Sequence, residues 1–268
     1  MCLAAKSKAM PPCSWRSSVF PRMVTPLERR FYQRPRARQL IAISKRFERD
    51  LRECYGWDRP ATLVYHGVDG EMFRPAEPGE RDAARARFGL TDGDWVWLFV
   101  GEAAKGLREA VGQLARFPKA RLLVASRSDP GEFRVQARRL GVAERLVFGG
   151  FQAQPVAAYH AADVFLYPSP YDPFGLVVGE AMACGLPVVT NPTIGAAEWI
   201  ESGQTGMLAA IGAGEEWSNC LQRLRDPGFA RKMGAAARQS VLRHTWAECA
   251  QQTASVYESL LGGQRGAG

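Results

Sequence analysis

The segment Asp172–Thr190, with the sequence DPFGLVVGEAMACGLPVVT, constrains the fold of this chain more than any other part. A Pro-Phe-Gly turn opens the segment, and the residues after Gly175 predict a helix that ends near Cys184. The apolar residues 187–190 then predict a buried strand. A turn, a short helix and a buried strand in direct succession are typical of an α/β protein with a parallel sheet.

Two carboxylates flank the expected start of this helix. Asp172 precedes the turn, and Glu180 follows eight positions later on the helix itself. A helix that begins at a glycine offers free backbone N–H groups and a positive dipole end to an anion. Carboxylates beside such a site can accept hydrogen bonds from hydroxyls. A ligand that carries both phosphate groups and hydroxyls is a nucleotide sugar, so the segment predicts a site for one. The alternative interpretation is a buried α/β segment in which the two acids only cap the helix or contact solvent.

A regular alternation of strands and helices surrounds this segment. Strands are predicted at residues 95–100, 121–126, 146–148, 164–167 and 207–209. Helices are predicted at residues 105–117, 133–140, 156–162 and 197–201, and residues 215–262 are mostly helical with a break at 226–228. The alternation predicts a Rossmann-like parallel sheet with helices on both faces, which binds ligands outside the carboxyl ends of its strands.

The first 90 residues are less regular. Residues 1–24 show no period and are expected to form an irregular head. Strands are predicted at 39–43 and 62–65, with a helix at 44–55 that Ser44 caps and Gly56 ends. These elements predict part of a second Rossmann-like domain. A short basic helix is predicted at 26–34, and the RPAEPGE stretch at 74–80 has the composition of a linker.

The positive charge of the chain is concentrated at the N-terminal end. The net charge is +8, and residues 1–60 hold 14 Lys or Arg against 5 Asp or Glu. This excess predicts attraction to an anionic membrane surface or a phosphorylated acceptor, and an equally good interpretation is a solvated basic face. Nucleic acid is not an expected partner, because no motif for binding it accompanies the charge.

Apolar residues make up 46% of the chain, which is ordinary for a globular protein, and no apolar run is long enough to span a bilayer. Six cysteines and three histidines show no metal-ligand spacing, so no metal is expected. The cysteines are expected to be reduced thiols, which predicts a cytoplasmic protein. If the basic segment binds lipid, the protein would be peripheral at the inner face of a membrane.

The stretch 168–188, with the sequence PSPYDPFGLVVGEAMACGLPV, resembles the E-x7-E signature of retaining glycosyltransferases of family 4, also called group 1. The family pattern reads approximately P-S-x-x-E-P-F-G-L-x-x-x-E-A-M-A-x-G-x-P-V. Weaker similarity is found in IAIS at 41–44, HGVD at 66–69, FRP at 73–75 and FVG at 99–101. The resemblance covers about residues 38–261 and implies the GT-B architecture, in which two Rossmann domains face each other.

The resemblance also implies roles for the residues that match the signature. Asp172 would meet hydroxyls of the donor sugar, and Glu180 would accept hydrogen bonds from the ribose. The turn at Phe174 and the backbone N–H groups of Gly175, Leu176 and Val177 would hold the distal phosphate or the sugar.

Lys105 would pair with the diphosphate and neutralise the leaving group, beside Gly101 in the same loop. The loops around Arg127 and Phe151 would flank the base. The donor is a nucleoside diphosphate sugar, the acceptor a glycan or glycolipid, and no cofactor is implied.

Three departures from the family pattern bear on activity. The first acid is Asp172 where the family usually has Glu, and its reach is shorter by about 1.5 Å. Glu102 stands near the place of a family arginine. About 75 residues precede the linker, roughly half of a Rossmann domain.

We therefore divide the chain into five parts. They are an irregular head at 1–24, a remnant of the N-terminal acceptor domain at 25–75, a linker at 76–90, a nucleotide-sugar-binding domain at 91–215 and C-terminal helices at 216–262.

The favoured function is hexose transfer with retention, in lipopolysaccharide or exopolysaccharide synthesis. The alternative is a truncated nucleotide-sugar-binding module that is catalytically incomplete without a partner or a missing N-terminal half. A Rossmann oxidoreductase is disfavoured, because no G-x-G-x-x-G follows Val100.

Overall fold

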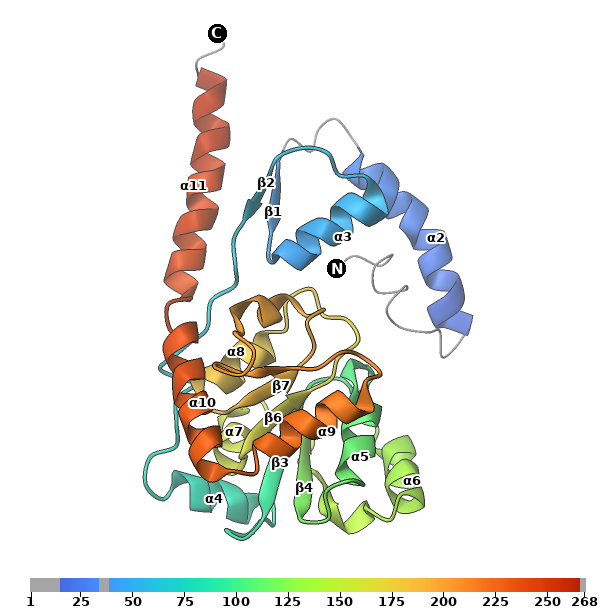
Figure 1. The fold of residues 1–268 in the computed structure, drawn as a ribbon. Coiled ribbons are helices and arrows are strands. Elements are labelled where there is room, and N and C mark those ends of the chain that lie inside the picture. The colour runs from blue at the N-terminus through green and yellow to red at the C-terminus, as the bar shows by residue number, and fades with distance from the viewer. Residues whose placement is uncertain (1–14, 34–38, 266–268) are drawn as a thin grey trace.

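A six-stranded parallel sheet forms the centre of the computed structural model, which describes residues 15–33 and 39–265 (Figure 1). Its strands are β3 (Trp95–Val100), β4 (Ala120–Ala125), β5 (Leu146–Phe148), β6 (Val164–Tyr167), β7 (Val188–Thr190) and β8 (Met207–Leu208). Their order is β5-β4-β3-β6-β7-β8, and every neighbouring pair is parallel. The expected α/β class and Rossmann-like sheet are confirmed. The order reverses between β3 and β6, where ligands bind in sheets of this kind.

Helices and 3₁₀ turns connect the strands and flank the sheet (Figure 1). They are η1 (Ala103–Lys105), α5 (Leu107–Leu114), α6 (Gly131–Arg139), η2 (Ala143–Arg145), α7 (Val156–Ala161), α8 (Leu176–Ala183), η3 (Gly195–Trp199), α9 (Gly214–Arg223) and α10 (Pro227–Val241). The strands are almost fully buried, since both faces of the sheet are covered.

A second, small unit precedes this domain. It contains α2 (Trp15–Tyr32), β1 (Leu40–Ala42), α3 (Lys45–Tyr55) and β2 (Ala61–Leu63), and β1 pairs with β2 in parallel. As predicted, the Ser44 hydroxyl caps α3 and Gly56 ends it in the left-handed conformation. The unit has its own apolar cluster, which includes Leu51, Tyr55 and Trp57. Tyr171, from the segment between β6 and α8, is fully buried in the same cluster and ties the two units together.

The prediction of an irregular head over 1–24 is wrong from Trp15 onward, where α2 begins; residues 1–14 lie outside the described residues. The Pro and Ser residues of this stretch, Pro21 among them, gave no helical period. The structure extends the helix predicted at 26–34 toward the N-terminus, and its later part is held by α3: Arg29 donates to the Cys54 carbonyl at 3.0 Å, and Glu28 accepts from Tyr55.

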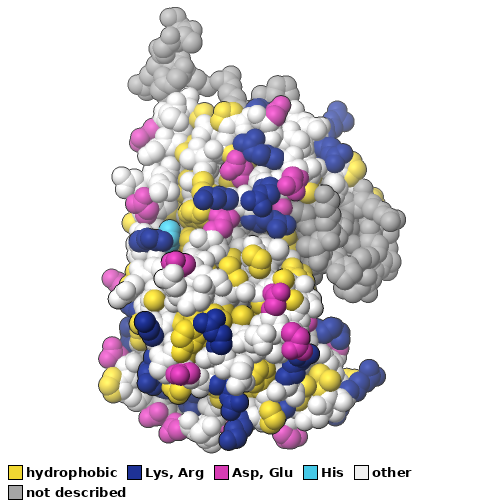
Figure 2. Space-filling view, viewed as in Figure 1, with side chains coloured by type: hydrophobic (Ala, Val, Ile, Leu, Met, Phe, Trp, Pro, Cys, Tyr) yellow, Lys and Arg dark blue, Asp and Glu magenta, His cyan; other side chains and the backbone are white. Residues whose placement is uncertain are grey.

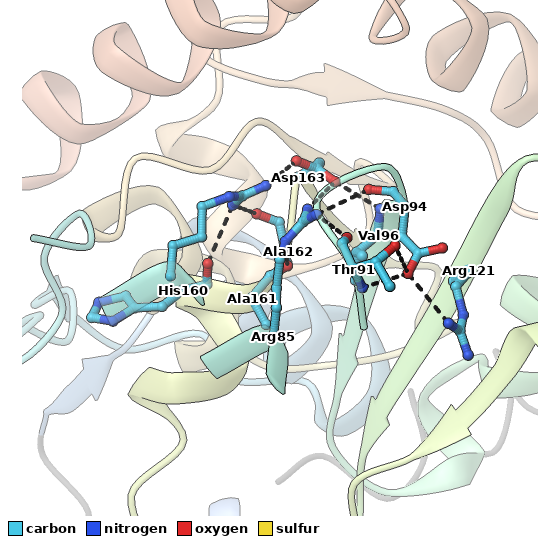
Figure 3. A network of polar contacts seen from close by, with 10 residues as sticks. Arg85, Thr91, Asp94, Val96, Arg121, His160, Ala161, Ala162 and Asp163 are labelled. Carbon is cyan, nitrogen blue, oxygen red and sulfur yellow. Dashed lines mark hydrogen bonds and ion pairs between the residues drawn. The ribbon is translucent and has the colours of Figure 1, made fainter. Parts of the chain in front are cut away.

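The prediction of a linker over 76–90 is also wrong in its second half, where α4 (Glu80–Arg87) forms. Arg81 and Arg85 on α4 both pair with Asp163 just before β6, at 2.5 and 2.9 Å. Figure 3 shows Arg85 and Asp163. Arg85 is only 2% exposed and also donates to the carbonyl of Ala161. This network fixes α4 to the sheet domain.

The C-terminal helices run as predicted, with the break before Pro227. A further break separates α10 from α11 (Trp246–Arg265), which projects away from the sheet domain (Figure 1). Within the described residues, no helix combines the length and apolar character needed to cross a membrane.

Candidate functional site

Two loops meet at the carboxyl edge of the sheet, where the strand order reverses. One follows β3 and contains Gly101 and Lys105; the other follows β6 and leads through Asp172 to α8. A β-carbon at Gly106, which has φ +98°, would lie 2.1 Å from the Pro168 carbonyl oxygen. Only glycine allows the two loops to approach this closely.

The two charged residues expected to contact the ligand contact each other. Lys105 Nζ lies 2.9 Å from Asp172 Oδ2 and donates to the Tyr171 carbonyl at 3.1 Å. The Tyr167 hydroxyl donates to the same Asp172 Oδ2 at 2.9 Å. The Phe174 N–H donates to Oδ1 at 3.2 Å. The side chains of Lys105 and Asp172 are 21% and 18% exposed, so solvent reaches both.

The N-terminus of α8 is open to a ligand. Gly175 precedes it at φ +90°, and no side chain caps the helix. Among the described residues, the backbone N–H groups of Gly175, Leu176 and Val177 have no hydrogen-bond acceptor. Because unpaired N–H groups at a helix start favour anions, this turn can hold a phosphate or a sugar hydroxyl.

Glu180 lies on α8, and the Tyr159 hydroxyl donates to its Oε2 at 2.7 Å. Burial raises the pKa of Glu180, and the hydrogen bond from Tyr159 opposes that rise. Burial also raises the pKa of Tyr159 well above its ordinary value, so the phenol keeps the proton that it donates. Glu180 is thereby held as an acceptor with lone pairs left for a hydroxyl.

Arg127 and Phe151 come from the loops after β4 and β5 and form one surface. The Arg127 guanidinium carbon lies 3.8 Å from the centroid of the Phe151 ring. The Ser126 N–H donates to the Gly150 carbonyl at 3.1 Å and joins the two loops. Phe151 is 56% exposed and leaves an aromatic face available for stacking. Glu102, the acid near the place of a family arginine, is exposed.

The small N-terminal unit also contacts the signature segment. Ser44 Oγ donates to the Pro173 carbonyl at 2.8 Å. Glu198 on η3 accepts hydrogen bonds from the N–H groups of Lys45 and Arg46 at 3.1 and 2.8 Å, and from the Tyr65 hydroxyl at 2.7 Å. The start of α3 is therefore held against the sheet domain by a carboxylate.

Sequence reasoning missed Tyr159, Tyr167 and Glu198. Tyr167 is the last residue of β6, five positions before Asp172, and a polar aromatic at a strand's carboxyl end is a usable signal. Tyr159 and Glu198 carried no such signal, because their partners are distant in the sequence. Among the described residues, no group of three or more His, Cys, Asp or Glu could hold a metal ion.

A cavity of about 530 Å³ lies elsewhere. It is lined by residues at the amino ends of the strands, including Trp95, Asp163 and Pro187, and by Arg81 of α4. Neither signature carboxylate lines it. The candidate site is therefore the carboxyl edge of the sheet, where Lys105 pairs with Asp172 just before α8, the helix that carries Glu180.

Comparison with known proteins agrees with this geometry. Residues 95–226 match the family model described as Glycosyl transferases group 1. The chain belongs to this family. It is 33% identical over 249 residues to D-inositol 3-phosphate glycosyltransferase of Streptomyces bingchenggensis, an alignment covering 85% of this chain and 54% of that protein. The chain thus spans about half the length of the curated relatives it matches.

Several solved structures share the fold of this chain. Sucrose-phosphate synthase from Thermosynechococcus elongatus superposes with a TM-score of 0.82 at 26% identity, over 97% of this chain and 66% of that one. HepE from Anabaena, solved in complex with UDP and glucose, has a TM-score of 0.76 at 25% identity, over 89% and 66% of the two chains. The chain therefore has the GT-B fold, represented mostly by its C-terminal domain and by part of its N-terminal one.

Proposed function

We propose that this group 1 glycosyltransferase chain binds a nucleoside diphosphate sugar and transfers its hexose, with retention, to a hydroxyl of a glycan or glycolipid. The observation that carries the proposal is the ion pair of Lys105 with Asp172 directly before the uncapped N-terminus of α8, the helix that carries Glu180, at the reversal point of the sheet. A cation and free amides suit a diphosphate, and a carboxylate on the same helix suits a ribose.

Each group has a role in this proposal. Glu180 accepts hydrogen bonds from the ribose, and the surface of Arg127 and Phe151 stacks on the base. Lys105 pairs with the diphosphate and stabilises the charge that develops as the sugar C1–O bond breaks. The acceptor hydroxyl forms the new bond from the same face, and its proton passes to a diphosphate oxygen. No protein carboxylate is needed as a nucleophile, in contrast to retaining glycosidases.

UDP-glucose is the first donor to test. The complex of HepE with UDP and glucose supports that choice, because its likeness to this chain extends over the donor-binding domain. The names of D-inositol 3-phosphate glycosyltransferase and sucrose-phosphate synthase indicate that phosphorylated acceptors occur among the relatives. Phosphorylated polyols therefore join glycans and glycolipids as test acceptors. A place in lipopolysaccharide or exopolysaccharide synthesis stays a prediction.

A second candidate function is a nucleotide-sugar-binding module that lacks transfer activity by itself. One observation favours it: the described part of the N-terminal unit has a sheet of two strands, β1 and β2. Catalysis in a two-domain enzyme requires both walls of the cleft to position acceptor and donor and to exclude water. This chain supplies one complete wall and a part of the other.

The N-terminal unit is also the candidate for contact with an anionic membrane surface, on the cytoplasmic side. Met23, Leu27 and Phe31 recur every fourth residue on α2 and are 68%, 67% and 59% exposed. Basic residues accompany them on the same segment, as on helices that lie in a membrane interface. On the face shown in Figure 2, Lys and Arg side chains lie among Asp and Glu side chains. That face therefore gives no argument for membrane contact, and the proposal of such a contact depends on α2.

Two measurements test these proposals. Titration calorimetry with UDP, GDP, ADP and UDP-glucose should detect binding in the micromolar to millimolar range. A transfer assay with labelled UDP-glucose and a mixture of acceptors then separates the enzyme from the binding module. Binding with turnover supports the glycosyltransferase, and binding without turnover supports the module. Folded protein that binds none of the four ligands would refute both.

A further inference from the structure

Each signature carboxylate is held by the hydroxyl of a buried tyrosine. Tyr167 donates to Asp172 at 2.9 Å, and Tyr159 donates to Glu180 at 2.7 Å. The two tyrosines are 2% and 1% exposed and pack on either side of Phe165, at centroid distances of 5.9 and 5.8 Å. Neither hydroxyl is placed to act on a solvent-borne ligand. Both are placed to fix the carboxylate that does.

Lys105 cannot donate all of its hydrogen bonds to a diphosphate while it keeps the one to Asp172. Its ammonium group has three donors, and two of them already go to Asp172 and to the Tyr171 carbonyl. A carboxylate offers about four lone-pair positions, and Lys105, Tyr167 and the Phe174 N–H occupy three of those of Asp172. In this structure Asp172 therefore has little capacity left for a sugar hydroxyl.

We propose that Tyr167 is a positioning residue that holds Asp172 for the donor sugar once Lys105 has moved to the diphosphate. The inference rests on the proposed function. When Lys105 leaves, Oδ2 gains a free lone pair but keeps the hydrogen bond from Tyr167, while Oδ1 keeps the one from Phe174. Asp172 can then accept a sugar hydroxyl without swinging away.

The packing of Tyr167 suits this role. β-Carbons placed at Gly101 and Gly175 would each contact its ring, at 3.7 and 3.8 Å. The ring therefore lies directly beneath both glycine turns of the site, and Phe99 and Phe165 flank it at 6.1 and 5.9 Å. A ring fixed in this way presents its hydroxyl in one direction. Support of this kind matters more for Asp172 than for the longer glutamate of the family pattern.

The protonation of Tyr167 agrees with the geometry. Burial, and next the negative charge of Asp172, raise the pKa of the phenol well above its ordinary value. The hydroxyl therefore keeps its proton, and stays a donor, at neutral pH.

The decisive comparison uses two ligands and two matched variants. Tyr167→Phe removes the hydroxyl that holds the sugar-binding carboxylate, and Tyr159→Phe removes the one that holds the ribose-binding carboxylate. Calorimetry with UDP and with UDP-glucose measures the dissociation constants of both variants and of the wild type. Tyr167→Phe should weaken UDP-glucose binding roughly tenfold, the loss of one hydrogen bond to a charged group, with UDP binding unchanged within about twofold. Tyr159→Phe should weaken the binding of both ligands by similar factors.

Asp172→Asn provides a second test that keeps the tyrosine ring and its packing in place. It should reproduce the selective loss of UDP-glucose affinity. Combined with Tyr167→Phe it should add less than it does alone, because both changes act on the same hydrogen bond, which Asp172→Asn weakens and Tyr167→Phe removes.

The results distinguish a failure of the role of Tyr167 from a failure of the proposed function. Equal losses for UDP and UDP-glucose in Tyr167→Phe, or no loss for either, would overturn the role of Tyr167 while leaving the donor site intact. Full additivity of Tyr167→Phe and Asp172→Asn would overturn it as well. A wild-type protein that binds neither ligand would instead overturn the proposed function.

Discussion

Gly175 and Ile194 lie so close together that a β-carbon at Gly175 would be 2.7 Å from Ile194 Cγ2. Gly175 is also left-handed, with φ +90°. We expect Gly175→Ala to lower the free energy of unfolding by more than the roughly 1–2 kcal/mol of left-handed strain alone. Chemical denaturation measures the change. Gly141→Ala is the matched control, because Gly141 is left-handed at φ +69° and a β-carbon there meets nothing within 4 Å. Equal losses in both variants would contradict the steric argument.

Removal of the Lys105 charge should weaken nucleotide binding. Lys105→Met keeps most of the side-chain length but cannot pair with a diphosphate. A charge-assisted hydrogen bond contributes about 1.5–3 kcal/mol, so the dissociation constant for UDP should rise at least tenfold. Calorimetry measures it, with Lys119→Met as a control outside the site. A variant that binds UDP as well as the wild type does would remove Lys105 from the diphosphate site.

Glu180 predicts a dependence of stability on pH. Burial raises its pKa from the ordinary value of 4.5, so the folded state binds its proton more tightly than the unfolded state does. The stabilising contribution of this group is then complete below pH 4.5 and is lost as the pH rises through the raised pKa. Glu180→Gln, which imitates the protonated form, should unfold at a higher temperature than the wild type at pH 7. The difference should disappear near pH 4. A constant difference across this range would contradict the assignment.

Nucleotide affinity should show the opposite trend with pH. The ribose is expected to bind the ionised form of Glu180, so UDP binding should weaken as the pH falls into the range just above 4.5. Glu180→Gln should bind UDP weakly at every pH and keep only the change that titration of the terminal phosphate of UDP itself causes. Calorimetry at several pH values tests both statements, and a wild-type affinity that stays constant down to pH 4.5 would argue against a ribose contact.

Phe151 should contribute to binding of the base and not of the diphosphate. Stacking of a base on an aromatic ring is worth about 1–3 kcal/mol. Phe151→Ala should therefore weaken UDP binding by at least fivefold, while the affinity for inorganic pyrophosphate stays unchanged. Competition between the two ligands measures the ratio. A parallel loss for pyrophosphate would show that the variant disturbs the whole edge of the sheet.

The sheet could be predicted from the sequence because its strands are short apolar runs between turn residues, as in Trp95–Val100 and Val164–Tyr167. Helix α4 could not, since its sequence follows a Pro- and Gly-containing stretch and its position depends on Asp163, about eighty residues later. Local composition contains no information about such a partner.

The candidate site likewise contains residues that the sequence predicts and contacts that it does not. The residues of one continuous motif, Asp172, Gly175 and Glu180, could be named from their spacing, and the strand pattern placed Lys105 at the same edge. The ion pair of Lys105 with Asp172 and the hydrogen bond of Tyr159 to Glu180 could not be predicted. Both depend on side-chain directions that are set only when the two loops and two helices pack together.

The carboxylate of Glu198 has a consequence for domain motion. It binds the first N–H groups of α3, while Ser44 binds the signature turn and Tyr171 is buried against α3 from the other side. Three attachments hold α3 to the donor domain, so the helix moves with that domain as one rigid body. The crossover after β2 is therefore not the only connection between the two units, and we expect α3, with α2 packed on it, to follow the donor domain in any motion.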